Sequence, residues 1–259
     1  MASRKAILGN GGSVTFDELN LNDGKVLNSR PILESFIKDP ILIDMLNCPL
    51  MYYGNAREGD MDFYQFVIMF KSIFVEGFAK PVGGMQYILH LLEQKFKKLG
   101  GELRMGSGVT SINAKNGTVE SVTLENGEQL VAESVISSMG YVETLNHCSP
   151  GLEKTESCAT GQVSFMESLC VVDCEPRDLG YDKSIVFFST QPQFDYKVPN
   201  DMVNPTTGVL CCSNNFNYPV PMKEGLIRLT NLANFSKWDL LSRKDYIAAK
   251  KYWRTQALE

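Results

Sequence analysis

The stretch from residue 83 to residue 132 constrains the fold most, because a helix signal is followed directly by two hairpin signals. Its first half ends in lysines and Gly100-Gly101, and its apolar residues recur at spacings of three and four: Met85, Ile88, Leu89, Leu92, Phe96 and Leu99. Two dipeptides that favour tight hairpin turns, Asn116-Gly117 and Asn126-Gly127, then separate strand-like runs. We therefore predict a helix over 85–99 and a β-meander with strands over 102–105, 109–114, 118–124 and 129–132.

The run Ser134 to Met139 follows this meander and ends at Gly140. It combines apolar residues with serines, a composition that suits a buried strand. Its small residues would let another group approach the backbone. We predict a further strand here.

The region before residue 84 is predicted to be helical. Ser29 and Asp39 are candidate N-caps for helices over 31–38 and 40–47, and Pro40 suits a first helical position. A third helix over 61–75 is apolar on nearly every side, so it must lie in a core or face an apolar ligand. Periodicity alone favours an ordinary core helix, and the wall of an apolar cavity is the alternative.

From about residue 161 onward, strand patterns dominate. They cover residues 163–172, 184–189, 208–212 and 226–232, and a helix begins at Arg243. Helices first and strands later predict an α+β chain, with a helical part, a β-meander and one mixed or antiparallel sheet.

Composition narrows the function. The 259 residues hold 25 Lys+Arg and 30 Asp+Glu, for a net charge of -5, so the broad positive field of a nucleic-acid-binding protein is missing and we expect no nucleic-acid partner. Seven irregularly placed cysteines without CxxC spacing fit a reducing cytoplasm. No apolar run approaches the roughly 20 residues that a transmembrane helix needs, which predicts a soluble chain.

Familiar catalytic motifs are missing from the sequence. Gly9-Asn10-Gly11-Gly12 begins like the dinucleotide motif GxGxxG, but Val14 stands at the third glycine position. Neither His90 nor His147 has a second ligand at metal-binding spacing, so we expect no metal site and interpret His90 as a partly buried structural residue. The catalytic residues stay unassigned.

Most of the sequence from residue 31 to residue 253 nevertheless resembles one known family. The string Pro81-Val82-Gly83-Gly84-Met85, the helix, Gly100-Gly101-Glu102-Leu103, Val109-Thr110-Ser111-Ile112 and Val135-Ile136-Ser137-Ser138 resembles FAD-dependent oxidoreductases of the phytoene desaturase, carotenoid isomerase and retinol saturase type. These enzymes are related to the flavin amine oxidases. The tail over 219–253 is similar too, with less specific motifs.

The resemblance implies roles for individual residues. Val109, Ser137 and Ser138 would border FAD, and the Gly83-Gly84 turn would face the flavin or substrate end. Aromatic residues of the third helix become candidates for a lipophilic substrate pocket: Phe63, Phe66, Phe70 and Phe74. By the same likeness, residues 1–84 and 151–259 would be the helical and sheet parts of a substrate domain, and residues 85–150 part of the FAD domain.

The sequence also departs from that family. Its GxGxxG strand–turn–helix and its glycine-rich final segment have no counterpart here, so we expect an internal piece of such an enzyme that alone binds FAD weakly or not at all and is inactive. The expected partner is a lipophilic small molecule, in a cytoplasmic protein that can contact a membrane peripherally and self-associate through exposed apolar surface. The alternative is a non-catalytic module that binds an apolar ligand or a partner protein.

Overall fold

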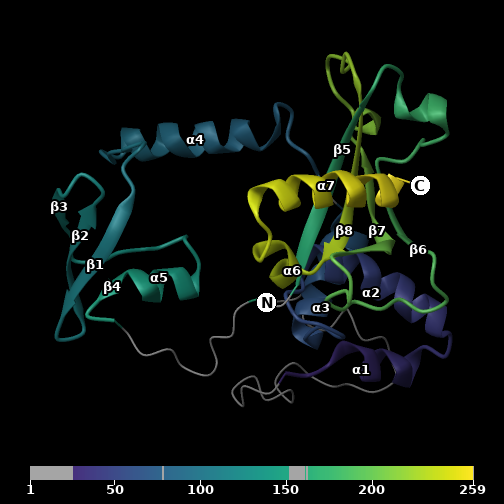
Figure 1. The fold of residues 1–259 in the computed structure, drawn as a ribbon, viewed down its shortest axis with the longest axis horizontal. Helices are drawn as coiled ribbons and strands as arrows, with labels where there is room; N and C mark the ends of the chain where they lie inside the picture. The colour runs from purple at the N-terminus through teal and green to yellow at the C-terminus, as the bar shows by residue number, and fades with distance from the viewer. Residues whose placement is uncertain (1–25, 78, 152–160, 162, 259) are drawn as a thin grey trace. The chain divides into compact units, whose positions relative to one another are not determined.

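The computed structural model describes residues 26–77, 79–151, 161 and 163–258 and divides the chain into two compact units (Figure 1). The helix–sheet unit contains residues 1–78, 163–216 and 222–259, and the meander unit contains residues 79–162 and 217–221. Helices dominate the first part of the described chain and strands the later part, where they form two sheets, which confirms the predicted α+β class. The functional domain limits at residues 84 and 150 stay a prediction.

The described part of the helix–sheet unit begins with three helices: α1 (Ser29–Phe36), α2 (Pro40–Gly54) and α3 (Phe63–Phe70), which continues as the π-helix η1 (Lys71–Glu76). Asp39 caps α2 as predicted, accepting hydrogen bonds from the backbone N–H groups of Ile41 and Leu42. The predicted cap Ser29 is wrong, because its hydroxyl bonds instead to the Asp60 carboxylate at 2.6 Å. Helix α2 continues beyond the predicted end at Asn47, with Pro49 inside it.

The second layer of this unit is a four-stranded antiparallel sheet in the order β5-β8-β7-β6. Its strands confirm the predicted runs: β5 (Ser164–Val172), β6 (Ile185–Ser189), β7 (Val203–Cys212) and β8 (Gly225–Ala233). Short 3-10 helices η2 (Pro176–Leu179) and η3 (Ser213–Asn215) lie between strands, and α6 (Phe235–Asp239) and α7 (Arg243–Leu258) follow.

Each face of this sheet has its own apolar core. One core joins Leu232 of β8 to the helices through Leu50, Met51 and Met61. The other contains Met166, Val203 and Ala233, against which Trp238 and Trp253 pack. Because neighbouring residues in a strand point to opposite faces, β8 contributes Leu232 to one core and Ala233 to the other.

The meander unit is built around a smaller sheet. Helix α4 (Gly84–Lys98) precedes β1 (Val109–Lys115), β2 (Thr118–Leu124) and β3 (Gln129–Val131), and α5 (Tyr141–His147) leads into β4 (Cys148–Ser149), with sheet order β3-β2-β1-β4. Asn116 and Gly117 adopt φ of 50° and 77° in the first hairpin turn, and Gly127 adopts 84° in the second. These positive φ values confirm the predicted turns.

Two predicted strands are wrong. Residues 102–105 and 134–139 form no regular structure, and within the described part of the chain neither segment pairs with a strand. Ile136 is 100% exposed rather than buried. Strand-like side chains are not sufficient, because a strand requires a neighbouring backbone for its hydrogen bonds. His90 is also exposed rather than partly buried, and its Nε2 lies 2.8 Å from the Gln94 amide nitrogen.

Candidate functional site

An apolar cavity of about 210 Å³ opens among α1, α2 and α3, and we call it the aromatic groove. Phe63, Phe66 and Phe70 lie on one face of α3 because they are three and four residues apart. Their rings stack successively, with centroids 6.1 and 5.9 Å apart. The remaining lining residues are also apolar: Ile32, Leu33, Phe36, Ile37, Leu46 and Val67.

The fourth predicted pocket residue, Phe74, does not line this groove. Its ring lies 5.1 Å from that of Phe70, yet the side chain is 46% exposed. Phe74 belongs to η1, and a π-helix has a wider turn than an α-helix, which changes the direction of side chains beyond Phe70. The structure therefore brings together three of the four predicted aromatic residues.

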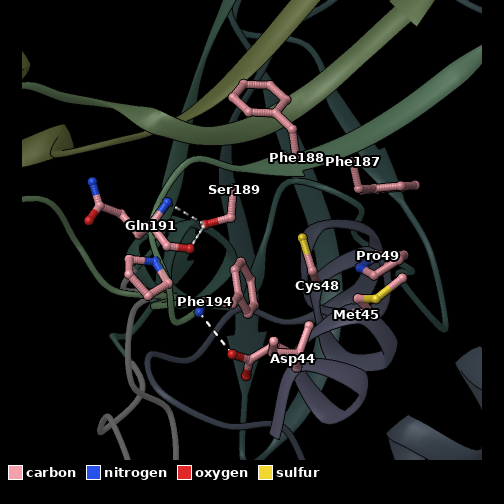
Figure 2. A pocket seen from close by; sticks show the side chains of 11 residues that line it. Asp44, Met45, Cys48, Pro49, Phe187, Phe188, Ser189, Gln191 and Phe194 are labelled. Atoms are coloured by element: carbon pink, nitrogen blue, oxygen red, sulfur yellow. Dashed lines mark hydrogen bonds between the residues drawn. The ribbon is translucent and has the colours of Figure 1, made fainter.

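A second pocket, of about 250 Å³, lies between α2 and the segment from β6 to Phe194 (Figure 2). We call it the α2–β6 pocket. Its walls are mostly apolar, with Met45 and Pro49 on the helix and Phe187 and Phe194 opposite. Asp44 and Cys48 are the titratable groups among its lining residues.

The two titratable groups of the α2–β6 pocket are both held by their surroundings, Asp44 by polar contacts and Cys48 by burial. Asp44 forms an ion pair with Arg30 at 2.6 Å and accepts a hydrogen bond from the Phe194 N–H at 3.0 Å (Figure 2). Burial, with a smaller contribution from the Asp44 charge, raises the pKa of the Cys48 thiol to about 12. Sequence reasoning missed this pocket, although a lone aspartate in so apolar a helix was a detectable signal.

In the meander unit, a register shift gives the sheet one apolar and one polar face. Val109 pairs with Leu124 and Ile112 pairs with Val122, so all four share a face although Val109 and Ile112 are three residues apart. On the other face, the Asn113 amide donates to the hydroxyls of Ser121 and Thr123. The predicted cofactor residue Val109 thus belongs to the apolar face.

Ser137 and Ser138 line a groove of about 540 Å³ together with Ile112, Val119 and residues at the start of α5. The Ser137 hydroxyl accepts a 2.7 Å hydrogen bond from that of Thr144, which fixes the loop against α5. Val109 lines a separate groove of about 330 Å³ with Arg104, Val122 and Leu124. The structure therefore places the two serines together and Val109 elsewhere on the unit.

The Gly83-Gly84 turn lines neither groove. Both residues adopt positive φ, 87° and 71°, which explains why glycine is needed there. The Gly84 N–H donates to the Pro81 carbonyl, and a Cβ added at Gly84 would meet nothing within 4 Å. The turn thus leaves accessible backbone at the start of α4.

Two kinds of feature are missing from the residues that the structure describes. These residues contain no cluster of three or more His, Cys, Asp or Glu side chains that could hold a metal ion. They also contain no helix long and apolar enough to cross a membrane.

With this geometry established, comparison with known proteins decides the family. Residues 15–174, more than half of the chain, match the family of flavin containing amine oxidoreductases. The chain belongs to this family. The resemblance seen in the sequence is therefore confirmed, and the family implies a flavin cofactor.

Two curated relatives of this flavin oxidoreductase have carotenoid-related names. A 4,4'-diapolycopene oxygenase of Methylomonas sp is 27% identical over 132 residues, which is 51% of this chain and 25% of the relative. A chloroplastic prolycopene isomerase of Daucus carota is 29% identical over 113 residues, 43% of this chain and 18% of the relative. These matches span a quarter or less of each relative's length.

Solved structures share the fold. A Pyrococcus furiosus protein aligns with a TM-score of 0.59 at 13% identity, over 91% of this chain and 55% of that one. An oxidoreductase from Methanosarcina mazei aligns with a TM-score of 0.54 at 16% identity, over 87% of this chain and 50% of that one. At these identities the likeness establishes the fold alone.

The meander unit has features that suit part of a flavin nucleotide. Its serine-lined groove combines an apolar sheet face with hydroxyl groups and with Gly140, whose φ is 111°. Apolar walls suit a flat ring, and hydroxyls can bond to ribose or ring oxygens. Ser137, Ser138 and the backbone near Gly140 are therefore the groups that could hold one portion of the cofactor.

Proposed function

We propose that this chain is part of an FAD-dependent oxidoreductase, a desaturase, saturase or isomerase, that acts on a lipophilic substrate such as a polyene. The observation that carries the proposal is the aromatic groove, an apolar cavity lined by three stacked phenylalanines in a flavin oxidoreductase. Long apolar molecules gain affinity from such a lining by leaving water. The names of the two curated relatives point toward the same substrate class.

FAD, when bound, supplies the hydride acceptor or donor. The chain's own residues then have to orient the substrate and exclude water. Phe63, Phe66 and Phe70 would hold the apolar body of the substrate, and the α2–β6 pocket offers a second, mostly apolar surface. Ser137 and Ser138 would contact the cofactor, and Val109 and Gly83-Gly84 would approach it through their backbones.

The cofactor half of the proposal is tested by FAD titration. We expect the 259-residue chain to bind FAD weakly or not at all, and a longer polypeptide carrying a GxGxxG segment to purify as a yellow protein. In the longer protein, Ser137→Ala/Ser138→Ala should weaken FAD binding about tenfold, the cost of about one lost hydrogen bond. A colourless longer protein would contradict the enzyme proposal and favour a non-catalytic module.

The substrate half is tested with diphenylhexatriene, a fluorescent polyene, added to the 259-residue chain. Phe70→Ser should weaken polyene binding about tenfold or more, because a large apolar contact is lost. Phe74→Ser is the matched control, since Phe74 lies outside the groove, and should change binding less than about twofold. Equal losses in both variants would show that the polyene binds elsewhere.

A further inference from the structure

Helix α7 carries a concentration of positive charge that the proposed function does not use. Although the chain has a net charge of -5, this 16-residue helix contains five cations, Arg243, Lys244, Lys250, Lys251 and Arg254, and one carboxylate, Asp245. All five cations are exposed, and none forms an ion pair with any residue that the structure describes. Lys250 lies over the Tyr246 ring, 5.8 Å from its centroid.

The cations occupy one side of α7. Arg243, Ile247, Lys250, Arg254 and Leu258 follow one another at spacings of three and four, so they lie along one face, and Lys244 and Lys251 flank it. We call this face the α7 stripe. A side of the helix adjacent to the stripe packs into the unit through Trp253 and Ala257. The one carboxylate, on Asp245, accepts a hydrogen bond from the Ser242 hydroxyl at the start of the helix, and its single negative charge offsets only one of the five positive charges.

Aliphatic side chains are interspersed with these cations. Ile247 is 55% exposed and Leu258 is 50% exposed. Beside them, Lys250, Lys251 and Arg254 border a groove of about 600 Å³ against the edge strand β5, where Met166 and Leu169 contribute apolar surface. Glu167 also lines this groove, but its carboxylate accepts a hydrogen bond from Thr230 and lies 3.8 Å from Arg228.

We propose that the α7 stripe binds the surface of a bilayer that contains anionic lipids. Exposed cations interspersed with aliphatic side chains on a packed helix match the charged headgroups and the acyl boundary of such a surface. A nucleic acid would pair with the cations but leave Ile247 and Leu258 without a partner. The proposal does not depend on flavin or on the substrate, so it can fail while the proposed function holds.

Helix α4 offers the sharpest comparison, because it also combines exposed apolar residues with lysines. Its three lysines, Lys95, Lys97 and Lys98, are confined to the last turn, and Lys97 is paired with Glu93 at 2.6 Å. The cations of α7 instead extend over most of the helix and are unpaired among the described residues. We therefore expect α7 rather than α4 to determine binding.

The test is co-sedimentation of the 259-residue chain with vesicles. One set contains phosphatidylcholine alone, and the other contains about one third phosphatidylserine, in about 0.1 M salt, where surface charges act over about 10 Å. We expect binding to the anionic vesicles, little binding to the neutral ones, and release by about 1 M salt, where that range falls to about 3 Å.

Matched variants locate the surface. The triple variant Lys250→Gln/Lys251→Gln/Arg254→Gln should lower the partition coefficient about 100-fold, since each cation near a charged bilayer contributes about fivefold. The control Lys95→Gln/Lys97→Gln/Lys98→Gln removes the same charge from α4 and should change the partition coefficient less than about threefold. Circular dichroism checks that both variants fold, which the exposure of all six side chains favours.

Several outcomes would overturn the proposal. They are equal binding to neutral and anionic vesicles, binding that survives the α7 substitutions, and a loss that follows the α4 substitutions instead. Binding to single-stranded nucleic acid or heparin without binding to anionic vesicles would also overturn it, because the ligand would then be another polyanion.

Discussion

Helices α2 and α4 have the same length of 15 residues and differ in almost every other respect. Helix α2 buries seven residues between two other helices and the sheet, although it contains Pro49. Helix α4 has the regular apolar spacing of an amphipathic helix, yet none of its residues is buried. Local pattern therefore does not determine how strongly a helix is held, because most helical stability in proteins comes from tertiary packing.

The same contrast separates the two units. The helix–sheet unit has cores on both faces of its sheet. Among the described residues of the meander unit, the buried ones are Ile112, Ser121 and Leu124. We therefore expect the helix–sheet unit to unfold cooperatively and the meander unit to depend on its hairpins.

The largest expected effect compares matched leucines on the two helices. Leu50 of α2 has no exposed surface, so Leu50→Ala should lower the free energy of unfolding by about 2–5 kcal/mol through lost burial and a cavity. Leu92 of α4 is 61% exposed, and Leu92→Ala should change the free energy of unfolding by less than about 0.5 kcal/mol. Urea titration measures both, with tryptophan fluorescence for the helix–sheet unit and circular dichroism for α4. Similar losses would mean that α4 is packed as tightly as α2.

The next largest expected effect concerns the ion pair between Arg30 and Asp44, which stabilises the position of α2. Asp44→Ala would leave the Arg30 guanidinium and the Phe194 N–H without their partner, and we expect a loss of about 2 kcal/mol, reduced from the fully buried case by the partial exposure of Arg30. The control is Arg104→Ala in the meander unit, which breaks exposed ion pairs with Glu102 and Glu128 and should leave the unfolding midpoint unchanged. A negligible effect of Asp44→Ala would show that the cost of burying this pair offsets its attraction, so that it adds no net stability.

Features with local causes could be predicted from the sequence. The Asn116-Gly117 turn and the Asp39 cap appear as predicted, and the strands of both sheets other than β4 overlap the predicted runs. These features depend on the chemistry of a few adjacent residues. The aromatic face of α3 could also be predicted from the sequence, because Phe63, Phe66 and Phe70 have helical spacing.

The predictions that were wrong, and the pocket that was missed, concern features that depend on residues distant in the sequence. The segments over 102–105 and 134–139 have strand-like composition, but pairing requires a neighbouring strand that local sequence does not reveal. Ser29 has the side chain of an N-cap, whereas the fold brings Asp60 to its hydroxyl from 31 residues away. The α2–β6 pocket was missed for the same reason, because Asp44 and Phe194 are 150 residues apart.

A smaller effect tests whether the hairpins hold the meander unit. Gly117 adopts a φ of 77°, so Gly117→Ala should destabilise the β1–β2 hairpin by about 1–2 kcal/mol. Asn116→Gly is the control at the neighbouring position, where φ is 50° and glycine fits without strain, and should change stability by less than about 1 kcal/mol. Amide hydrogen exchange in β1 and β2 measures both. Unchanged protection in Gly117→Ala would show that the unit tolerates a distorted turn.

The smallest expected effect is a loss of folding stability at high pH, caused by burial of the Cys48 thiol in α2. Burial raises the pKa of this thiol from 9.0 to about 12, so between these values the unfolded chain loses a proton that the folded chain keeps. Stability should be unaffected below pH 9 and should fall above it, by about 1 kcal/mol between pH 9 and pH 10. Cys48→Ala removes the thiol, so its stability should fall less over that interval, and the difference between the two curves isolates the thiol from the tyrosines. Identical curves would mean that the thiol ionises as readily in the folded protein as in the unfolded chain, and that α2 is less tightly packed around Cys48 than its burial indicates.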